Sequence, residues 1–253
     1  MTPARRVEVA PGRLGGWVER FTASHGEVSW SLDRGTSPSS WLGTAADGSW
    51  ARLQGWADPG AGERSPLAPA DEGAPTGDGA QAVVRVQPGT WARPPGPLLV
   101  VLVRRGGYAV AVASPAGELV RHKVGTRHVQ SRTAAGGWSQ QRFARRRGNQ
   151  ADALVEAVVG HARRLVEGEP GGAEVRGGGG APVPTARQGV EALVLGGDRT
   201  LAAEVLEELA TGPLTTLDGL PRRELWHLPD PRRAVLDEAL RRAVAVRVDV
   251  HNA

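Results

Sequence analysis

The sequence contains no cysteine, one methionine, one tyrosine and two phenylalanines. Disulfides, thiolate zinc sites, iron–sulfur clusters and cysteine nucleophiles all need thiols, so this chain can form none of them. Lysine is almost absent as well: Lys123 is the only one, and the rest of the 31 Lys and Arg residues are arginines. Arginine keeps its charge at any working pH, and its planar guanidinium matches phosphate geometry, which favours a nucleic-acid partner.

Long apolar runs are also missing. The longest, Leu98 to Val103, is far too short to cross a bilayer, and residues 1–14 lack the apolar core of a signal peptide. We therefore expect a soluble, cytoplasmic protein that does not bind membranes. Its 253 residues are enough for one large or two small domains with buried cores.

Two segments, residues 57–79 and 168–186, hold almost no large apolar side chains. Such segments cannot offset the entropy lost on ordering, so they are predicted to be a linker and a flexible insertion. Four glycines at 177–180 lack the Gly-Lys-Ser/Thr ending of a phosphate-binding loop, which favours the linker interpretation. The predicted organisation is an N-terminal α/β region over 1–56, a linker or loop over 57–80, and a larger domain over 81–253 with the insertion at 168–186.

The N-terminal region is rich in tryptophan. Six of the eight Trp residues precede residue 95, which indicates a layer with packing of its own. Short strands are predicted over 7–9, 27–32 and 49–53, together with an amphipathic helix over 14–24.

The hydrophobic pattern of the larger domain predicts an α/β fold with a mixed sheet covered by helices. An apolar strand over 98–104 and a strand over 108–113 flank a hairpin turn at Gly106-Gly107. The other predicted elements are a long strand over 118–130, a helix over 139–167, a strand over 192–195, helices over 199–210 and 231–243, and a strand over 244–250.

Positive charge is concentrated in one element. Between Glu118 and Asp152, 33 consecutive residues include eight basic side chains and no acidic one, so the remainder of this +4 chain carries −4. Four of the arginines fall in the first turns of the predicted helix, where the helix dipole already favours anions. Arg142 and Arg146 also form a like-charge i,i+4 pair, a local cost that indicates a bound polyanion, with phosphate the expected one.

The connection between the strand and this helix reads Gly136-Gly137-Trp138-Ser139-Gln140. The glycines permit close backbone approach, Ser139 is a suitable N-cap, and Gln140 is an uncharged amide between the glycines and the arginines. This loop resembles the catalytic loop of the archaeo-eukaryotic release-factor superfamily, and within it the Vms-like peptidyl-tRNA hydrolases of bacterial, actinobacterial type. The termination factors have a Gly-Gly-Gln tripeptide here, whereas the two residues inserted before Gln140 resemble the ribosome-rescue branch.

The resemblance covers residues 96–250 and implies a ribonuclease-H-like sheet. It implies codon-independent hydrolysis of the ester between a nascent peptide and its tRNA, on stalled or split large ribosomal subunits. The implied partners are peptidyl-tRNA and large-subunit rRNA, without DNA and without a cofactor. The implied catalytic residues are Gln140, Gly136, Gly137 and Ser139. The residues expected to bind RNA are Lys123, Arg127, Arg132, Trp138, Arg142, Arg145, Arg146 and Arg147.

The sequence also predicts which other domains and sites are absent from this chain. We expect no codon-reading domain, zinc finger or ankyrin-type repeat, because no segment of suitable length or pattern is present. No metal site is expected: His122 and His128 share a strand face but are six residues apart, too far to chelate one ion. Trp138 either stacks on a base or packs on the sheet. At Asp198, a strand-to-helix turn capped by its carboxylate is favoured over an anion site.

Two other functions remain open. A non-catalytic RNA-binding or rRNA-binding module of ribonuclease-H-like fold would also use a basic loop. A nuclease that cuts within the 3′ end of the tRNA would use the same target. Gln140 favours an enzyme over a binding module, because an uncharged amide between glycines adds little to phosphate binding.

Overall fold

The computed structural model describes residues 4–60, 65–69, 86–126, 139–167, 173–174, 189–211, 214, 217 and 219–253, with the side chains of 68–69, 86–87, 139–149 and 173–174 left out of that description. The chain forms two compact units. The N-terminal unit comprises residues 1–95 and 244–253, and the central unit comprises residues 96–243. In the described parts of the chain, no helix is long and apolar enough to cross a membrane.

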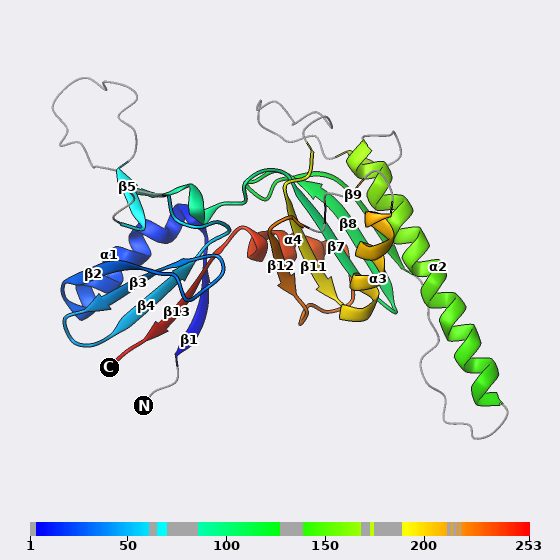
Figure 1. The fold of residues 1–253 in the computed structure, drawn as a ribbon, viewed down its shortest axis with the longest axis horizontal. Coiled ribbons are helices and arrows are strands. Elements are labelled where there is room, and N and C mark those ends of the chain that lie inside the picture. The colour runs from blue at the N-terminus through cyan, green and yellow to red at the C-terminus, as the bar shows by residue number, and fades with distance from the viewer. Residues whose placement is uncertain are drawn as a thin grey trace. The chain divides into compact units, whose positions relative to one another are not determined.

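The N-terminal unit is built on a five-stranded antiparallel sheet with the order β1-β13-β4-β3-β2 (Figure 1). Its strands are β1 (Arg5–Val9), β2 (Val28–Asp33), β3 (Ser40–Ala45), β4 (Trp50–Gln54) and β13 (Val246–His251). The other elements are the short helices η1 (Pro11–Arg13) and η2 (Thr90–Ala92), the helix α1 (Leu14–His25), and a two-stranded ribbon of β5 (Leu67–Pro69) and β6 (Val86–Pro88).

One face of this sheet carries the core of the N-terminal unit. Leu14, Val18 and Phe21 recur at helical spacing on α1 and are buried against alternate residues of the strands. Trp41 and Trp91 lie in the same core, and both are almost fully buried. The period-two burial of the strands thus matches one apolar and one solvated face, as expected of an antiparallel sheet.

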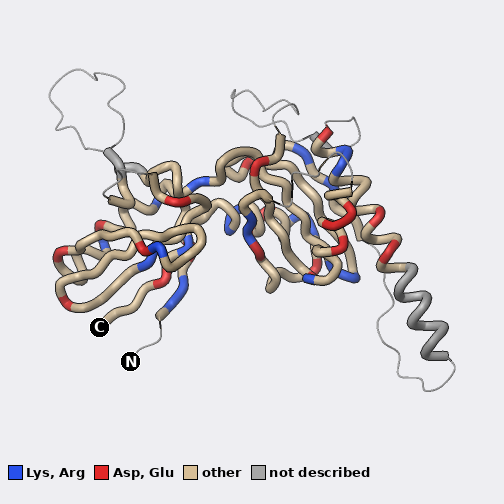
Figure 2. The backbone as a smooth tube through the Cα atoms, viewed as in Figure 1, with Lys and Arg blue, Asp and Glu red and all other residues tan. Residues whose placement is uncertain are grey.

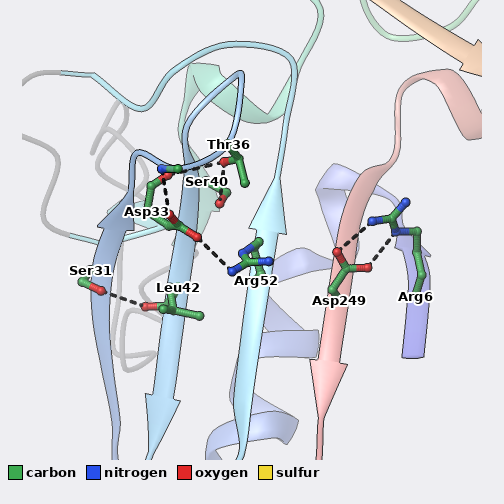
Figure 3. A network of polar contacts seen from close by, with 9 residues as sticks. Arg6, Ser31, Asp33, Thr36, Ser40, Leu42, Arg52 and Asp249 are labelled. Atoms are coloured by element: carbon green, nitrogen blue, oxygen red, sulfur yellow. Dashed lines mark hydrogen bonds and ion pairs between the residues drawn. The ribbon is translucent and has the colours of Figure 1, made fainter. Parts of the chain in front are cut away.

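The opposite face of the sheet carries a polar network (Figure 3). The strand register aligns Arg6, Asp249, Arg52, Leu42 and Ser31 in one row across the five strands. Arg6 donates through Nε and Nη2 to the two carboxylate oxygens of Asp249, at 2.7 and 2.8 Å. Arg52 forms a second ion pair, at 3.0 Å, with Asp33 of β2.

The Arg6–Asp249 pair makes the stability of the N-terminal unit depend on pH. The hydrogen bond from Arg6 lowers the pKa of the Asp249 carboxyl below its usual value. A carboxyl with a lowered folded pKa stabilises the fold above its unfolded pKa, about 3.9, and this contribution is lost as the pH falls through the folded pKa.

We expect Asp249→Asn to lower the free energy of unfolding by about 0.5–1 kcal/mol at pH 7, since the pair is partly exposed. The difference from the wild type should shrink as the pH falls below about 4. Urea unfolding of both proteins at pH 7 and at acid pH measures it. A difference that stays constant with pH would contradict the assignment.

The C-terminal strand belongs to the N-terminal unit. The pattern of residues 244–250 predicts a strand, and β13 confirms it, but β13 lies between β1 and β4 and not in the larger domain predicted over 81–253. Val246 and Val248 are buried in the N-terminal core. The division between units in the structure therefore differs from the predicted one, because strand pairing joins segments that are distant in sequence.

The central unit is built on a six-stranded mixed sheet with the order β10-β9-β8-β7-β11-β12 (Figure 1). Its strands are β7 (Leu98–Arg104), β8 (Gly107–Ala113), β9 (Leu119–Thr126), β10 (Ala173–Glu174), β11 (Ala192–Gly197) and β12 (Arg222–Leu225). β7, β11 and β12 are parallel, and the β7-β8-β9-β10 part is antiparallel. The predicted mixed α/β architecture is confirmed, and its ribonuclease-H-like topology stays a prediction.

Three helices pack on this sheet: α2 (Ser139–Glu167), α3 (Arg199–Ala210) and α4 (Arg233–Ala243). The bounds predicted for α2 and α3 are confirmed. Leu154 and Val158 of α2 and Val205 of α3 share a core with alternate residues of β7, β8 and β11. α4 lies toward the other face, where its Arg233 Nη1 is 3.1 Å from Nε2 of His122.

Two side chains secure helix ends in the central unit. Asp198 accepts hydrogen bonds from the backbone N–H groups of Thr200 and Leu201, which confirms the predicted capped turn at the start of α3. Arg223, which is 3% exposed, donates to the carbonyl oxygens of Ala243 (2.8 Å) and Arg242 (3.4 Å) at the end of α4. A cation at a helix C-terminus complements the helix dipole.

Candidate functional site

The structure frames the predicted loop by its two stems. β9 ends at Thr126 and α2 begins at Ser139, so the loop connects the last residue of a strand to the first turn of a long helix. Residues 127–138 lie outside the described part of the chain. Residues 127–138 include five of the predicted site residues, which are Arg127, Arg132, Gly136, Gly137 and Trp138.

The other predicted residues of the loop region fall at the start of α2. Ser139 and Gln140 are its first two residues, and Arg142, Arg145, Arg146 and Arg147 follow within its first three turns. The side chains of these six residues are outside the description. Their backbone position is informative, because the first four N–H groups of a helix have no acceptor within the helix and carry its positive dipole end.

Charge is distributed unevenly along α2. Residues 139–149 contain four arginines and no acidic residue, whereas residues 150–167 contain three acidic residues and two arginines. Figure 2 shows acidic residues along the described part of this helix. The positive end of the helix dipole and the arginine cluster therefore coincide at the loop, which is where an anion would be bound most strongly.

The two described side chains of the basic element have different tasks. Lys123 pairs with Val110 across β8 and β9, and its side chain is exposed to solvent. Arg121, two residues earlier on the same strand face, donates from Nη1 to the carbonyl oxygen of Leu165 at 3.4 Å. Arg121 thus supports the last turns of α2, and Lys123 remains accessible to a partner.

A stacked aromatic pair joins the two stems, and sequence reasoning missed it. Tyr108, on β8, is 6% exposed and pairs directly with Gly125 near the end of β9. The ring of Tyr108 also stacks on the imidazole of His161 on α2, with 5.4 Å between centroids and 21° between planes. The available signals were the single tyrosine of the chain and a glycine inside a strand, which often marks a close approach.

No cluster of three or more histidine, aspartate or glutamate side chains suited to a metal ion occurs among the described residues. The residues that the sequence places in the loop and in the first turns of α2 supply amide groups, arginines and aromatic rings. A helix start of this kind can bind and polarise an oxygen anion through backbone and side-chain donors.

A mixed sheet from which one strand leads, through a loop with two glycines, into the arginine-rich start of a long helix fits a release-factor domain. The chain belongs to the Actinobacteria/chloroflexi VLRF1 release factor family, whose model matches residues 96–249. The match begins where the central unit begins and extends into β13. It confirms the family resemblance inferred from the loop. No curated protein matches the chain.

Proposed function

We propose that this chain is a codon-independent peptidyl-tRNA hydrolase that releases nascent peptides on stalled or split large ribosomal subunits. The observation that carries the proposal is the position of Gln140. It is the second residue of α2 and lies three residues after Gly137, in a member of a release-factor family. A glutamine in this setting is suited to act on a carbonyl group rather than only to bind phosphate.

The proposed reaction is hydrolysis of the ester between the peptide and the ribose at the tRNA 3′ end. The oxygen of a water attacks the carbonyl carbon, and the C–O bond to the ribose then breaks, with a proton passing to the ribose oxygen. An ester is activated, so the enzyme has to position the water and stabilise the oxyanion of the tetrahedral intermediate. The backbone N–H and side-chain amide of Gln140 are suited to both tasks. Gly136 and Gly137 let the backbone approach closely, and Ser139, the first residue of α2, adds a hydroxyl group at the helix start.

The basic residues are proposed to hold RNA. Lys123, Arg127, Arg132, Arg142, Arg145, Arg146 and Arg147 would contact phosphates of the tRNA acceptor end or of large-subunit rRNA, and Trp138 would stack on a base or ribose. The length of α2 supports this arrangement. Ala151 of α2 packs against the core of the central unit, and Gln140 precedes it by about 16 Å of helix axis. In the proposed complex, this distance would let the loop enter a crowded site while the sheet stays outside.

The two alternative functions make different predictions. A non-catalytic RNA-binding module would bind large subunits but would leave peptidyl-tRNA intact. A nuclease would release peptide that still carries nucleotides from the tRNA 3′ end. Hydrolysis is preferred over a binding module because phosphate binding does not require Gln140, and the nature of the released products distinguishes hydrolysis from a nuclease.

The proposal is tested by comparing peptide release from two substrates. One is stalled peptidyl-tRNA on isolated large subunits, and the other is the same tRNA on intact ribosomes with or without a stop codon. We expect release from the isolated subunits, with no stimulation by a stop codon. Release that requires a stop codon, or cosedimentation only with intact small subunits, would contradict the proposal.

The arginine cluster is expected to contribute to RNA binding mainly through phosphate contacts. Arg145→Gln combined with Arg146→Gln should weaken binding across RNA sequences and reduce the slope of log affinity against log salt by about one unit per lost contact. The fold should survive, because both charges oppose the helix dipole.

The matched control changes the same charge elsewhere. Arg20 and Arg34 are exposed arginines of the N-terminal unit, and replacing both with glutamine should leave the salt slope unchanged. Binding measured over a series of salt concentrations provides the slopes. Equal slopes for the wild type and the Arg145/Arg146 double variant would show that these arginines do not contact phosphate.

A further inference from the structure

We propose that Tyr108 is a positioning residue that clamps the two stems of the loop, holding the end of β9 to α2. This inference rests on the proposed function, because it assigns Tyr108 a role at the same site. Tyr108 lies in β8, so it belongs neither to the loop nor to either stem. Its ring contacts both.

The contact with β9 depends on glycine at position 125. A Cβ atom added to Gly125 would lie 2.5 Å from Cζ, 2.6 Å from Cε1 and 2.6 Å from Oη of Tyr108. The ring of Tyr108 therefore occupies the space directly over the Gly125 backbone, where any side chain would displace it. Gly125 precedes Thr126, the last residue of β9, so this contact fixes the strand next to the start of the loop.

The contact with α2 is a stack of the Tyr108 ring on the His161 ring, and Arg164 forms a hydrogen bond with His161. The ring centroids of Tyr108 and His161 are 5.4 Å apart. Nδ1 of His161 lies 2.7 Å from Nη2 of Arg164. A guanidinium can only donate, so Nδ1 of His161 accepts in this hydrogen bond. The hydrogen bond fixes the orientation of the imidazole that the tyrosine packs on.

The geometry of α2 makes this clamp important for Gln140. His161 follows Gln140 by 21 residues, about 32 Å along the helix axis. Over that length, a tilt of roughly 2° moves the helix start by about 1 Å, and a misplacement of that size can cost about 100-fold in rate. Many core residues hold α2 to the sheet, and Tyr108 adds contact with the strand that leads into the loop.

The test is a double-mutant cycle on peptide release from stalled peptidyl-tRNA on large subunits. Tyr108→Leu removes the ring atoms that lie over Gly125, and Gly125→Ala pushes the ring away from it. Each should lower kcat about 10- to 100-fold, with little change in the subunit concentration for half-maximal rate, because the RNA-binding residues are untouched. Tyr108→Phe keeps the ring and should restore kcat to within about threefold of wild type.

The double variant separates positioning from folding. Leucine at 108 lacks Cζ, Cε1 and Oη, so Gly125→Ala should be tolerated in that background, and the thermal stability should be no lower than that of Tyr108→Leu alone. Its kcat should nevertheless stay at the level of Tyr108→Leu, because both substitutions remove the same contact, that of the Tyr108 ring with Gly125. Leu209→Ala is the control: it creates a cavity in the same core, on α3, and leaves Tyr108, Gly125 and His161 unchanged.

A wild-type kcat in Tyr108→Leu would overturn the proposal, and so would an equal loss in Leu209→Ala at matched thermal stability. Backbone amide exchange provides a readout that does not depend on activity. Exchange at Thr126 and in the first turns of α2 should be faster in Tyr108→Leu than in the wild type or in Leu209→Ala. If the wild type releases no peptide, the proposed function fails, and unchanged exchange in Tyr108→Leu would refute the clamp separately.

Discussion

Replacing Gln140 with alanine is expected to lower the rate of peptide release by about 10²–10³-fold, which is the cost of losing one preorganised oxyanion donor. RNA binding and thermal stability should change little, because an amide at the first turn of a helix contributes little to either. The measurement is single-turnover release from stalled peptidyl-tRNA on large subunits, together with subunit binding and thermal unfolding of the same variant.

Two further variants divide the role of Gln140 between its side chain and its backbone. Alanine keeps the backbone N–H, so a loss below 100-fold would assign most of the stabilisation to that group. Gln140→Pro removes the N–H, and proline is tolerated in the first turn of a helix, where the structure places this residue. Gly137→Val should also impair release by restricting the loop. Full activity in both Gln140→Ala and Gly137→Val would leave only the RNA-binding module.

Gly197→Ala is expected to destabilise the central unit by about 3–5 kcal/mol, through a steric clash and backbone strain. Gly197 ends β11 with a φ of +95°, which side-chain-bearing residues rarely adopt. A Cβ there would lie 2.1 Å from the carbonyl oxygen of Val103. The same oxygen accepts a hydrogen bond from the backbone N–H of Asp198 at 2.8 Å, so the substitution also disturbs the start of α3.

The control for this substitution is Gly189→Ala in the same unit. No atom lies within 4 Å of a Cβ at Gly189, and its φ is outside the left-handed range. Its effect should lie within about 1 kcal/mol and can be stabilising, because alanine restricts the unfolded chain. Urea unfolding midpoints of the three proteins measure both effects. Equal midpoints for Gly197→Ala and the wild type would show that the turn between β11 and α3 relaxes freely.

Local patterns predicted most elements of the central unit. The apolar run of β7, the hairpin turn at Gly106-Gly107 and the helical periodicity of α2 depend on neighbours in sequence, and the structure confirms them. β12 was missed because Arg222 to Leu225 contains three charged residues, one of which is the buried Arg223. The partner of β13 was also missed, because no local pattern shows that Val246 and Val248 complete the core of a distant segment.

In the loop region too, local residue types were informative and contacts between separate elements were not predicted. Residue types predict a site made of the glycines, Gln140 and the arginines, and the family match supports the identification of the domain. The supporting contacts could not be predicted, because they join side chains from separate elements. The stack of Tyr108 on His161 links a strand to a helix, and Arg121 reaches the carbonyl of Leu165 rather than solvent. Of the two basic residues of this element whose side chains the structure describes, Arg121 supports α2 and Lys123 is exposed.

The most direct test of the proposed hydrolysis is the chemical state of the products after incubation with stalled peptidyl-tRNA on large subunits. Ester hydrolysis should give a free peptide with an unmodified carboxyl end and a tRNA with an intact 3′ end that can be aminoacylated again. A peptide that still carries nucleotides, with a tRNA shortened at its 3′ end, would show a nuclease. A peptidyl-tRNA that stays intact while the protein remains bound to the subunit would contradict catalysis altogether.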